Sequence, residues 1–128
     1  MYNPKFDIDL EFGQVYEEKI KTLLESKGKI EVKSERDTWL ETGNIAIEYR
    51  CRGKRSGIAM TEADWWFHVL TLDGDMVGMI CFPVLRLKLL MKAMYDKGIA
   101  KKVSGGDDNA SEMLLLPLNE LYSQQFYK

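Results

Sequence analysis

The sequence has few of the residues on which several common kinds of site depend. Its 128 residues include one histidine, His68, and two cysteines, Cys51 and Cys81. The cysteines lie far apart in apolar, strand-like stretches, which argues against a zinc site with clustered ligands and against a disulfide scaffold. We interpret them as reduced, partly buried thiols of a cytoplasmic protein. Because no nucleophile motif or second metal ligand lies near His68 in the sequence, we interpret it as a structural residue.

Long hydrophobic runs and a strong excess of one charge are also lacking. No run reaches the roughly 18 apolar residues of a membrane span, and the opening MYNPKFDIDL lacks the apolar core of a signal peptide. The formal net charge of −2 argues against a protein that binds nucleic acid through bulk positive charge. A nuclease remains compatible with this charge, because carboxylates that hold metal ions lower it and bound cations restore it locally.

The residues that are present have the composition of a folded domain. A chain of 128 residues with 45% hydrophobic and 30% charged residues fits one compact domain over residues 1–128. Apolar periodicity and turn residues predict a helix over 10–27, strands over 29–35 and 44–51, a helix over 62–70 capped by Thr61, a strand over 76–82, a helix over 83–97, a strand over 111–116 and a helix over 117–126. We therefore predict an α/β fold with a small mixed sheet flanked by helices.

Two of the predicted strands carry charged residues at alternate positions. In IEVKSE, the residues Glu31, Lys33 and Glu35 share one face of the strand. In NIAIEYR, Glu48 and Arg50 share a face opposite the isoleucines. If the two strands pair, Glu48 comes within reach of Glu35 or Glu31, and the carboxylates gather at one place.

Glu17 adds a further acid from the first predicted helix. It borders the apolar stripe of that helix, so its side chain could point along the junction of helix and sheet toward the same place. Carboxylate oxygens are the ligands that Mg²⁺ prefers, and a bound metal polarises a phosphate and activates water. Lys33, two residues after Glu31, has the E-x-K spacing of a lysine that orients this water. The alternative is a solvated sheet face with weak ion pairs.

A basic segment follows the second charged strand. Its side chains could hold the phosphates of a duplex beside the site. They are four cations and a serine, namely Arg50, Arg52, Lys54, Arg55 and Ser56. The alternative is a solvated hairpin end.

Several short motifs occur in order at tight spacing: FGQVYEE, IEVKSE, TGNIAIEY, GKRSGI and TEADWW. Together they resemble small phage-type proteins of the PD-(D/E)XK nuclease superfamily, over roughly residues 6–70. The resemblance implies a restriction-endonuclease-like core, a divalent-metal site with Mg²⁺ or Mn²⁺, and hydrolysis of DNA. It also implies the cytoplasm of a host cell as the location, if the protein is phage-encoded.

By position, the resemblance implies Glu17 as the helix acid, Glu35 or Glu31 as the first strand acid, Glu48 as the second and Lys33 as the catalytic lysine. The superfamily usually has an aspartate on one strand and E-x-K on the next. With Glu48 as the second acid, Glu35 or Asp37 stands in for the aspartate and Arg50 occupies the usual place of the lysine. With Glu31 and Lys33 as the E-x-K pair, Asp7 and Asp9 are the only earlier aspartates.

The sequence thus predicts a metal-dependent DNA endonuclease in which Glu17, Glu31, Glu35 and Glu48 supply metal ligands and Lys33 aligns the attacking water. A catalytically weak or inactive DNA-binding module and a structural or interaction protein of phage origin are the alternatives. A homodimer through the apolar helix from Val84 to Met94 is a further hypothesis, beside the reading of that segment as a core helix.

Overall fold

The computed structural model describes residues 4–25 and 29–127. The helices of this part of the chain are α1 (Pro4–Glu25), α2 (Thr38–Thr42) and α3 (Val84–Asp96), with short 3-10 turns between other elements. Its strands are β1 (Ile30–Glu35), β2 (Asn44–Cys51), β3 (Lys54–Arg55), β4 (Trp65–Leu72), β5 (Asp75–Pro83), β6 (Lys101–Gly105) and β7 (Ser111–Pro117). The predicted mixed α/β class is confirmed, but the strands form two small sheets instead of one.

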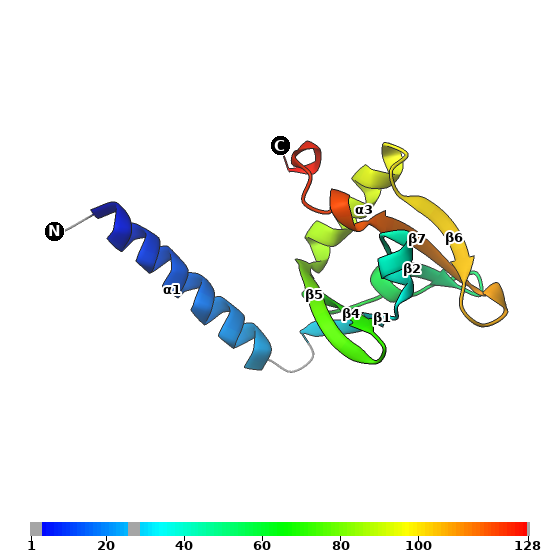
Figure 1. The fold of residues 1–128 in the computed structure, drawn as a ribbon, viewed down its shortest axis with the longest axis horizontal. Helices are drawn as coiled ribbons and strands as arrows, with labels where there is room; N and C mark the ends of the chain where they lie inside the picture. Colours follow the sequence, from blue (N-terminus) through cyan, green and yellow to red (C-terminus); the bar gives the residue numbers. More distant parts are fainter. Residues whose placement is uncertain (1–3, 26–28, 128) are drawn as a thin grey trace.

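The two sheets take their strands from interleaved parts of the sequence (Figure 1). The first has the order β1-β4-β5, with β1 parallel to β4 and β4 antiparallel to β5. The second has the order β3-β2-β7-β6 and is antiparallel throughout. The expectation that the strands over 29–35 and 44–51 pair is therefore wrong, because β1 pairs with β4 and β2 with β7 and β3.

Strand β4 occupies the position beside β1 that was predicted for β2. The prediction of a helix over 62–70 is wrong, because most of this segment belongs to β4. The run Trp65–Leu72 is rich in aromatic and β-branched residues, which favour strands. Thr61 caps no helix; its hydroxyl accepts a hydrogen bond from the Ala63 N–H at 3.2 Å. The N–H of Asp64 donates to the Lys29 carbonyl at 2.9 Å, which joins the start of β4 to the start of β1.

The main hydrophobic core lies where α3 packs against the sheets. Its fully buried side chains include Ile45 and Ile47 from β2, Leu87 and Met94 from α3, and Leu116 from β7. The predicted helix over 83–97 is confirmed: Pro83 precedes it, and Gly98 follows it with φ +73°. The inward side of α3 belongs to the core, and this supports the reading of the segment as a core helix.

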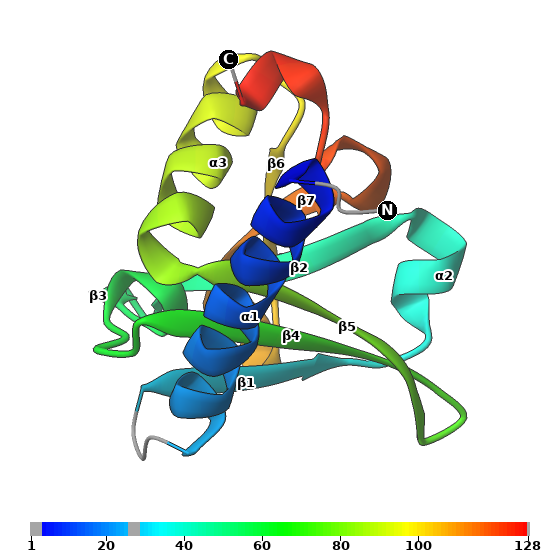
Figure 2. The same cartoon turned by 90° about the vertical axis from the view of Figure 1, so that its left-hand side faces the viewer.

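The first helix has a different environment. Figure 1 shows α1 extending away from the two sheets, and Figure 2, turned by 90°, shows it crossing in front of them. Over residues 10–25 all side chains are exposed except the half-buried Leu23. The prediction of a helix over 10–25 is confirmed, and residues 26 and 27 of that prediction lie outside the described residues. The expected buried stripe on this helix is wrong for this structure.

The end of the chain also differs from the prediction. No continuous helix spans 117–126; instead, 3-10 turns at Leu118–Glu120 and Gln124–Phe126 are separated by an extended Ser123. Strand β6, which the sequence did not predict, pairs with β7. Among the described residues, no helix is long and apolar enough to cross a membrane.

Candidate acidic site

A pocket of about 180 Å³ lies between the two sheets, and we call it the acidic pocket. Four strands contribute its lining: Lys33, Ser34 and Glu35 from β1, Ala46 and Glu48 from β2, Trp66 and His68 from β4, and Met113 from β7. Three of the residues singled out in the sequence, Lys33, Glu35 and Glu48, therefore meet, although the strands that carry them do not pair with each other.

Glu35 is largely enclosed in the pocket. Its side chain is 16% exposed, and its Oε1 lies 3.0 Å from Nε2 of His68. The same oxygen accepts a hydrogen bond from the N–H of Ala46. This N–H is available because β3 pairs only with Arg50 and Cys51, so none of the described strands lies beside β2 on that side at Ala46. Glu35 thus joins the edge of the second sheet to β4 of the first.

His68 was interpreted from the sequence as a structural residue, and the structure places it in contact with a predicted site residue. It is 2% exposed, and its Nδ1 lies 3.1 Å from Nε1 of Trp66. The signal that could have identified it is period-two alternation, which puts Trp66 and His68 on one face once 65–72 is treated as a strand. The incorrect helix prediction hid this alternation.

Glu48 is held by different contacts. Its Oε1 accepts a hydrogen bond from the Ser111 hydroxyl at 2.5 Å, across the β2–β7 pair. Behind it, Gly57 has φ +51°, and a Cβ at this position would lie 2.2 Å from the Glu48 carbonyl oxygen. Only glycine fits there, which explains the close return of the chain against β2 after the basic segment. Ser111 lies 63 residues away in the sequence and was not predicted.

The side chains of Lys33 and Glu31 are more exposed than that of Glu35. Their charged groups are 4.0 Å apart, and the Lys33 side chain is 48% exposed. An exposed pair at this separation stabilises the fold very little. Glu31 does not line the acidic pocket, whereas Lys33 does.

Glu17 is not brought to this pocket. It lies on the exposed α1, where it lines a separate hollow with Gly13, Tyr16, Ile20 and Lys21. The expectation that it points along a helix–sheet junction is wrong, because α1 does not pack on the sheet through the face that carries Glu17.

Metal ligation rests on a small donor set. Within residues 4–25 and 29–127, no group of three or more His, Cys, Asp or Glu side chains lies close enough to hold a metal ion. Glu35 and Glu48 each have one carboxylate oxygen without a hydrogen bond in the same part of the chain. Mg²⁺ is commonly bound by one or two carboxylates and several waters, so these two residues match the donor type that it requires.

The basic segment forms a tight hairpin next to Glu48. Arg52 and Gly53 both have positive φ, as in a type I′ turn. Arg50 lies 3.8 Å from the Glu112 carboxylate, and Arg55 donates to the Ala59 carbonyl at 2.9 Å. Arg52 and Lys54 are exposed at the hairpin.

Ser56 is the exception among the predicted DNA contacts. Its hydroxyl oxygen is buried and has no hydrogen-bond partner within the described residues. Its N–H donates to the Tyr49 carbonyl at 3.0 Å, which fixes the end of the hairpin against β2. This hydroxyl thus lies away from the surface of the hairpin, and its contact with phosphate stays a prediction.

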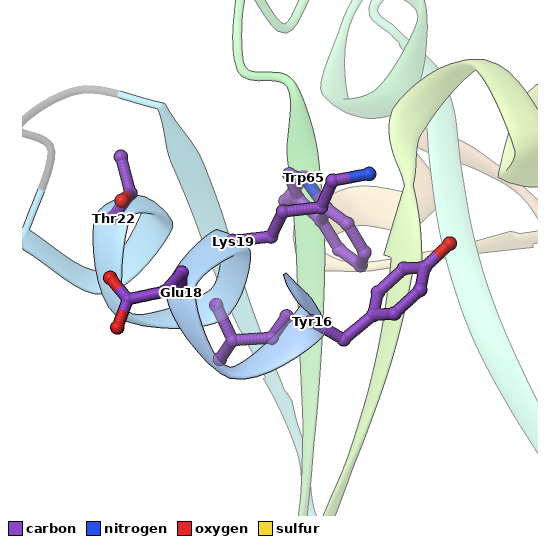
Figure 3. Close-up of a pocket in the computed structure, with 6 residues that line it drawn as sticks. Tyr16, Glu18, Lys19, Thr22 and Trp65 are labelled. Carbon is purple, nitrogen blue, oxygen red and sulfur yellow. The ribbon is translucent and has the colours of Figure 1, made fainter. Parts of the chain in front are cut away.

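A larger hollow of about 530 Å³ lies between α1 and the start of β4 (Figure 3). Figure 3 shows Tyr16 and Lys19 of α1 beside Trp65. Its lining includes two charged side chains, Glu18 and Lys19, and neither comes from the strands that carry the acidic pocket. The chemistry-bearing residues are thus concentrated in the smaller pocket.

Comparisons of the chain with protein-family models, with curated proteins and with solved structures found no match.

Proposed function

We propose that the protein is a metal-dependent DNA endonuclease of the PD-(D/E)XK type whose active site is the acidic pocket. The observation that carries the proposal is the convergence of Lys33, Glu35 and Glu48 from two separate sheets on one pocket. A merely solvated sheet face would not require the burial of Glu35 or its contacts with Ala46 and His68.

In this proposal, Glu35 and Glu48 are the residues that would hold Mg²⁺ or Mn²⁺. The metal, when bound, supplies Lewis-acid polarisation of the phosphate and a water of lowered pKa. Lys33 orients the attacking water and stabilises negative charge that develops on the phosphate. Arg52 and Lys54 hold the DNA backbone beside the pocket without reading bases.

A DNA-binding module that does not cut is the second candidate, and one observation favours it. The described residues offer two carboxylates and no third ligand for a metal, and one oxygen of each carboxylate is already engaged. In this case, the exposed hairpin cations supply salt-dependent binding to phosphates.

Cleavage of supercoiled plasmid, single-stranded and branched DNA tests the two candidates. We expect products with Mg²⁺ or Mn²⁺ and none with a chelator. Because Glu48→Gln removes a charged ligand and Lys33→Met removes the ammonium, each variant should lower the cleavage rate by about 100-fold or more. Glu41→Gln, an exposed position on α2, is the matched control and should cleave normally.

The remaining outcomes separate the candidates. Salt-sensitive DNA binding without products under any metal condition would favour the binding module. Cleavage that persists in both Glu48→Gln and Lys33→Met would contradict the assignment of the acidic pocket as the active site.

A further inference from the structure

We infer that Trp66 and His68 form a positioning pair for Glu35, which fixes one carboxylate oxygen of this residue and leaves the other for a ligand. The pair itself follows from buried contacts, and its effect on DNA cleavage rests on the proposed function. Neither residue is assigned a direct contact with substrate or metal.

The protonation of His68 follows from its neighbours. The indole Nε1–H of Trp66 can only donate a hydrogen bond, and it lies 3.1 Å from Nδ1 of His68. Nδ1 must therefore be the acceptor, and the ring proton is on Nε2. Nε2 lies 3.0 Å from Glu35 Oε1, so it donates to the carboxylate. Both ring nitrogens are thus occupied, which excludes His68 from acting as a metal ligand or general base in this conformation.

The carboxylate of Glu35 is held from two directions at one oxygen. Oε1 accepts the N–H of His68 and the N–H of Ala46, while Oε2 has no hydrogen bond within the described residues. A hydrogen-bond donor to a metal-binding carboxylate orients that carboxylate before the metal binds. Loss of the donor typically lowers metal affinity or activity by about 10–100-fold.

The register of the first sheet builds this arrangement. Lys33 lies opposite His68, and Glu31 lies opposite Trp66, in the parallel β1–β4 pair. Side chains alternate along a strand, so Trp66 and His68 are on the same face of β4 as Glu35 on β1. A slip of one residue would turn Trp66 and His68 away from the carboxylate.

Nitrogen NMR of the full chain tests the pair without reference to activity. All histidine ring resonances belong to His68, because it is the only histidine. At neutral pH we expect a single tautomer with the proton on Nε2. We also expect Glu35→Ala to shift the Nε2 and Hε2 resonances and to speed exchange of Hε2 with water. A proton on Nδ1, a doubly protonated ring, or resonances unaffected by Glu35→Ala would overturn the inference.

Three variants then connect the pair to cleavage. His68→Gln keeps one donor and one acceptor, His68→Leu keeps neither, and Trp66→Phe removes only the indole N–H. We expect a loss of about 10–100-fold in kcat for His68→Leu, with most of the rate regained in His68→Gln and an intermediate loss in Trp66→Phe. Equal losses in His68→Gln and His68→Leu would overturn the positioning role.

These experiments distinguish failure of the proposed function from failure of the inferred Trp66–His68 pair. A wild-type chain that cleaves no DNA contradicts the proposed function, while the NMR result still decides whether the pair exists. Active enzyme with the wrong His68 tautomer contradicts the pair alone.

Discussion

The helices α1 and α3 both carry apolar residues at helical spacing, yet they lie in opposite environments. In α3, five apolar side chains are buried against the strands, namely Val84, Leu87, Leu90, Met91 and Met94. In α1, the apolar side chains that are exposed include Phe12, Val15, Tyr16, Ile20 and Leu24. The pattern that predicts an amphipathic helix therefore does not predict what covers its apolar face.

The difference between α1 and α3 also predicts where stability resides. α3 packs on β4, β5 and β7, so its apolar side chains contribute to the free energy of unfolding of the whole domain. The exposed side chains of α1 add little to that free energy, because exposed positions already contact water in the folded state.

The largest effect is expected for Met94→Ala in α3. Met94 is fully buried, and removal of its side chain leaves a cavity in a close-packed core, so the free energy of unfolding should fall by about 2–5 kcal/mol. Urea denaturation measures this change. Leu89→Ala on the same helix, where Leu89 is 63% exposed, should cost less than about 0.5 kcal/mol. Equal costs for the two variants would contradict the burial of one side of α3.

A much smaller effect is expected for Ile20→Ser in α1. Ile20 is 42% exposed, so the unfolding free energy of the domain should change by less than about 0.5 kcal/mol in the same denaturation experiment. The helix propensities of serine and isoleucine differ by at most a few tenths of a kcal/mol, so the loss of propensity adds little to this change. A loss above about 1.5 kcal/mol would show that the apolar face of α1 is covered in solution.

The smallest effect concerns Cys81, on the outward side of the first sheet. Cys81 lies opposite Phe67, which lies opposite the exposed Val32, so the three share one face. Burial raises the pKa of the Cys81 thiol above its ordinary value. Less thiolate is then present at pH 8, so iodoacetamide should react a few-fold more slowly with folded than with unfolded Cys51→Ser protein.

The pH dependence sharpens this prediction. Because the folded pKa is raised, the ratio of the unfolded to the folded alkylation rate should be largest below the ordinary thiol pKa and shrink as the pH rises through the folded value. Mass spectrometry of the alkylated chain gives both rates. Equal rates at pH 8 would show that this face does not shield the thiol.

Local patterns in the sequence were sufficient for some elements and misleading for others. Pro83 and Gly98 mark the limits of α3 through backbone chemistry that any sequence shows locally. The segment that begins at Thr61 combines a cap-like threonine with Asp64 at the third following position, and this resemblance to a capping box concealed β4. What decided between helix and strand was pairing with β1, a contact across more than thirty residues.

In the acidic pocket, too, local patterns in the sequence predict some of the residues and miss others. Period-two alternation was enough to put Lys33 and Glu35 on one face of β1, and Glu48 on the polar face of β2. His68 and Ser111, which bond these acids, lie 33 residues from Glu35 and 63 residues from Glu48. Such contacts depend on the relative placement of two sheets, for which a single sequence contains no local signal.

The bond from the Ala46 N–H to Glu35 has a thermodynamic consequence, because the two residues belong to different sheets. Any molecule that binds more tightly when this carboxylate has left the strand edge must also weaken the attachment of one sheet to the other. By linkage, loosening that attachment must strengthen binding of the same molecule by an equal factor. For such a molecule, occupancy of the pocket and cohesion of the two sheets are not independent quantities.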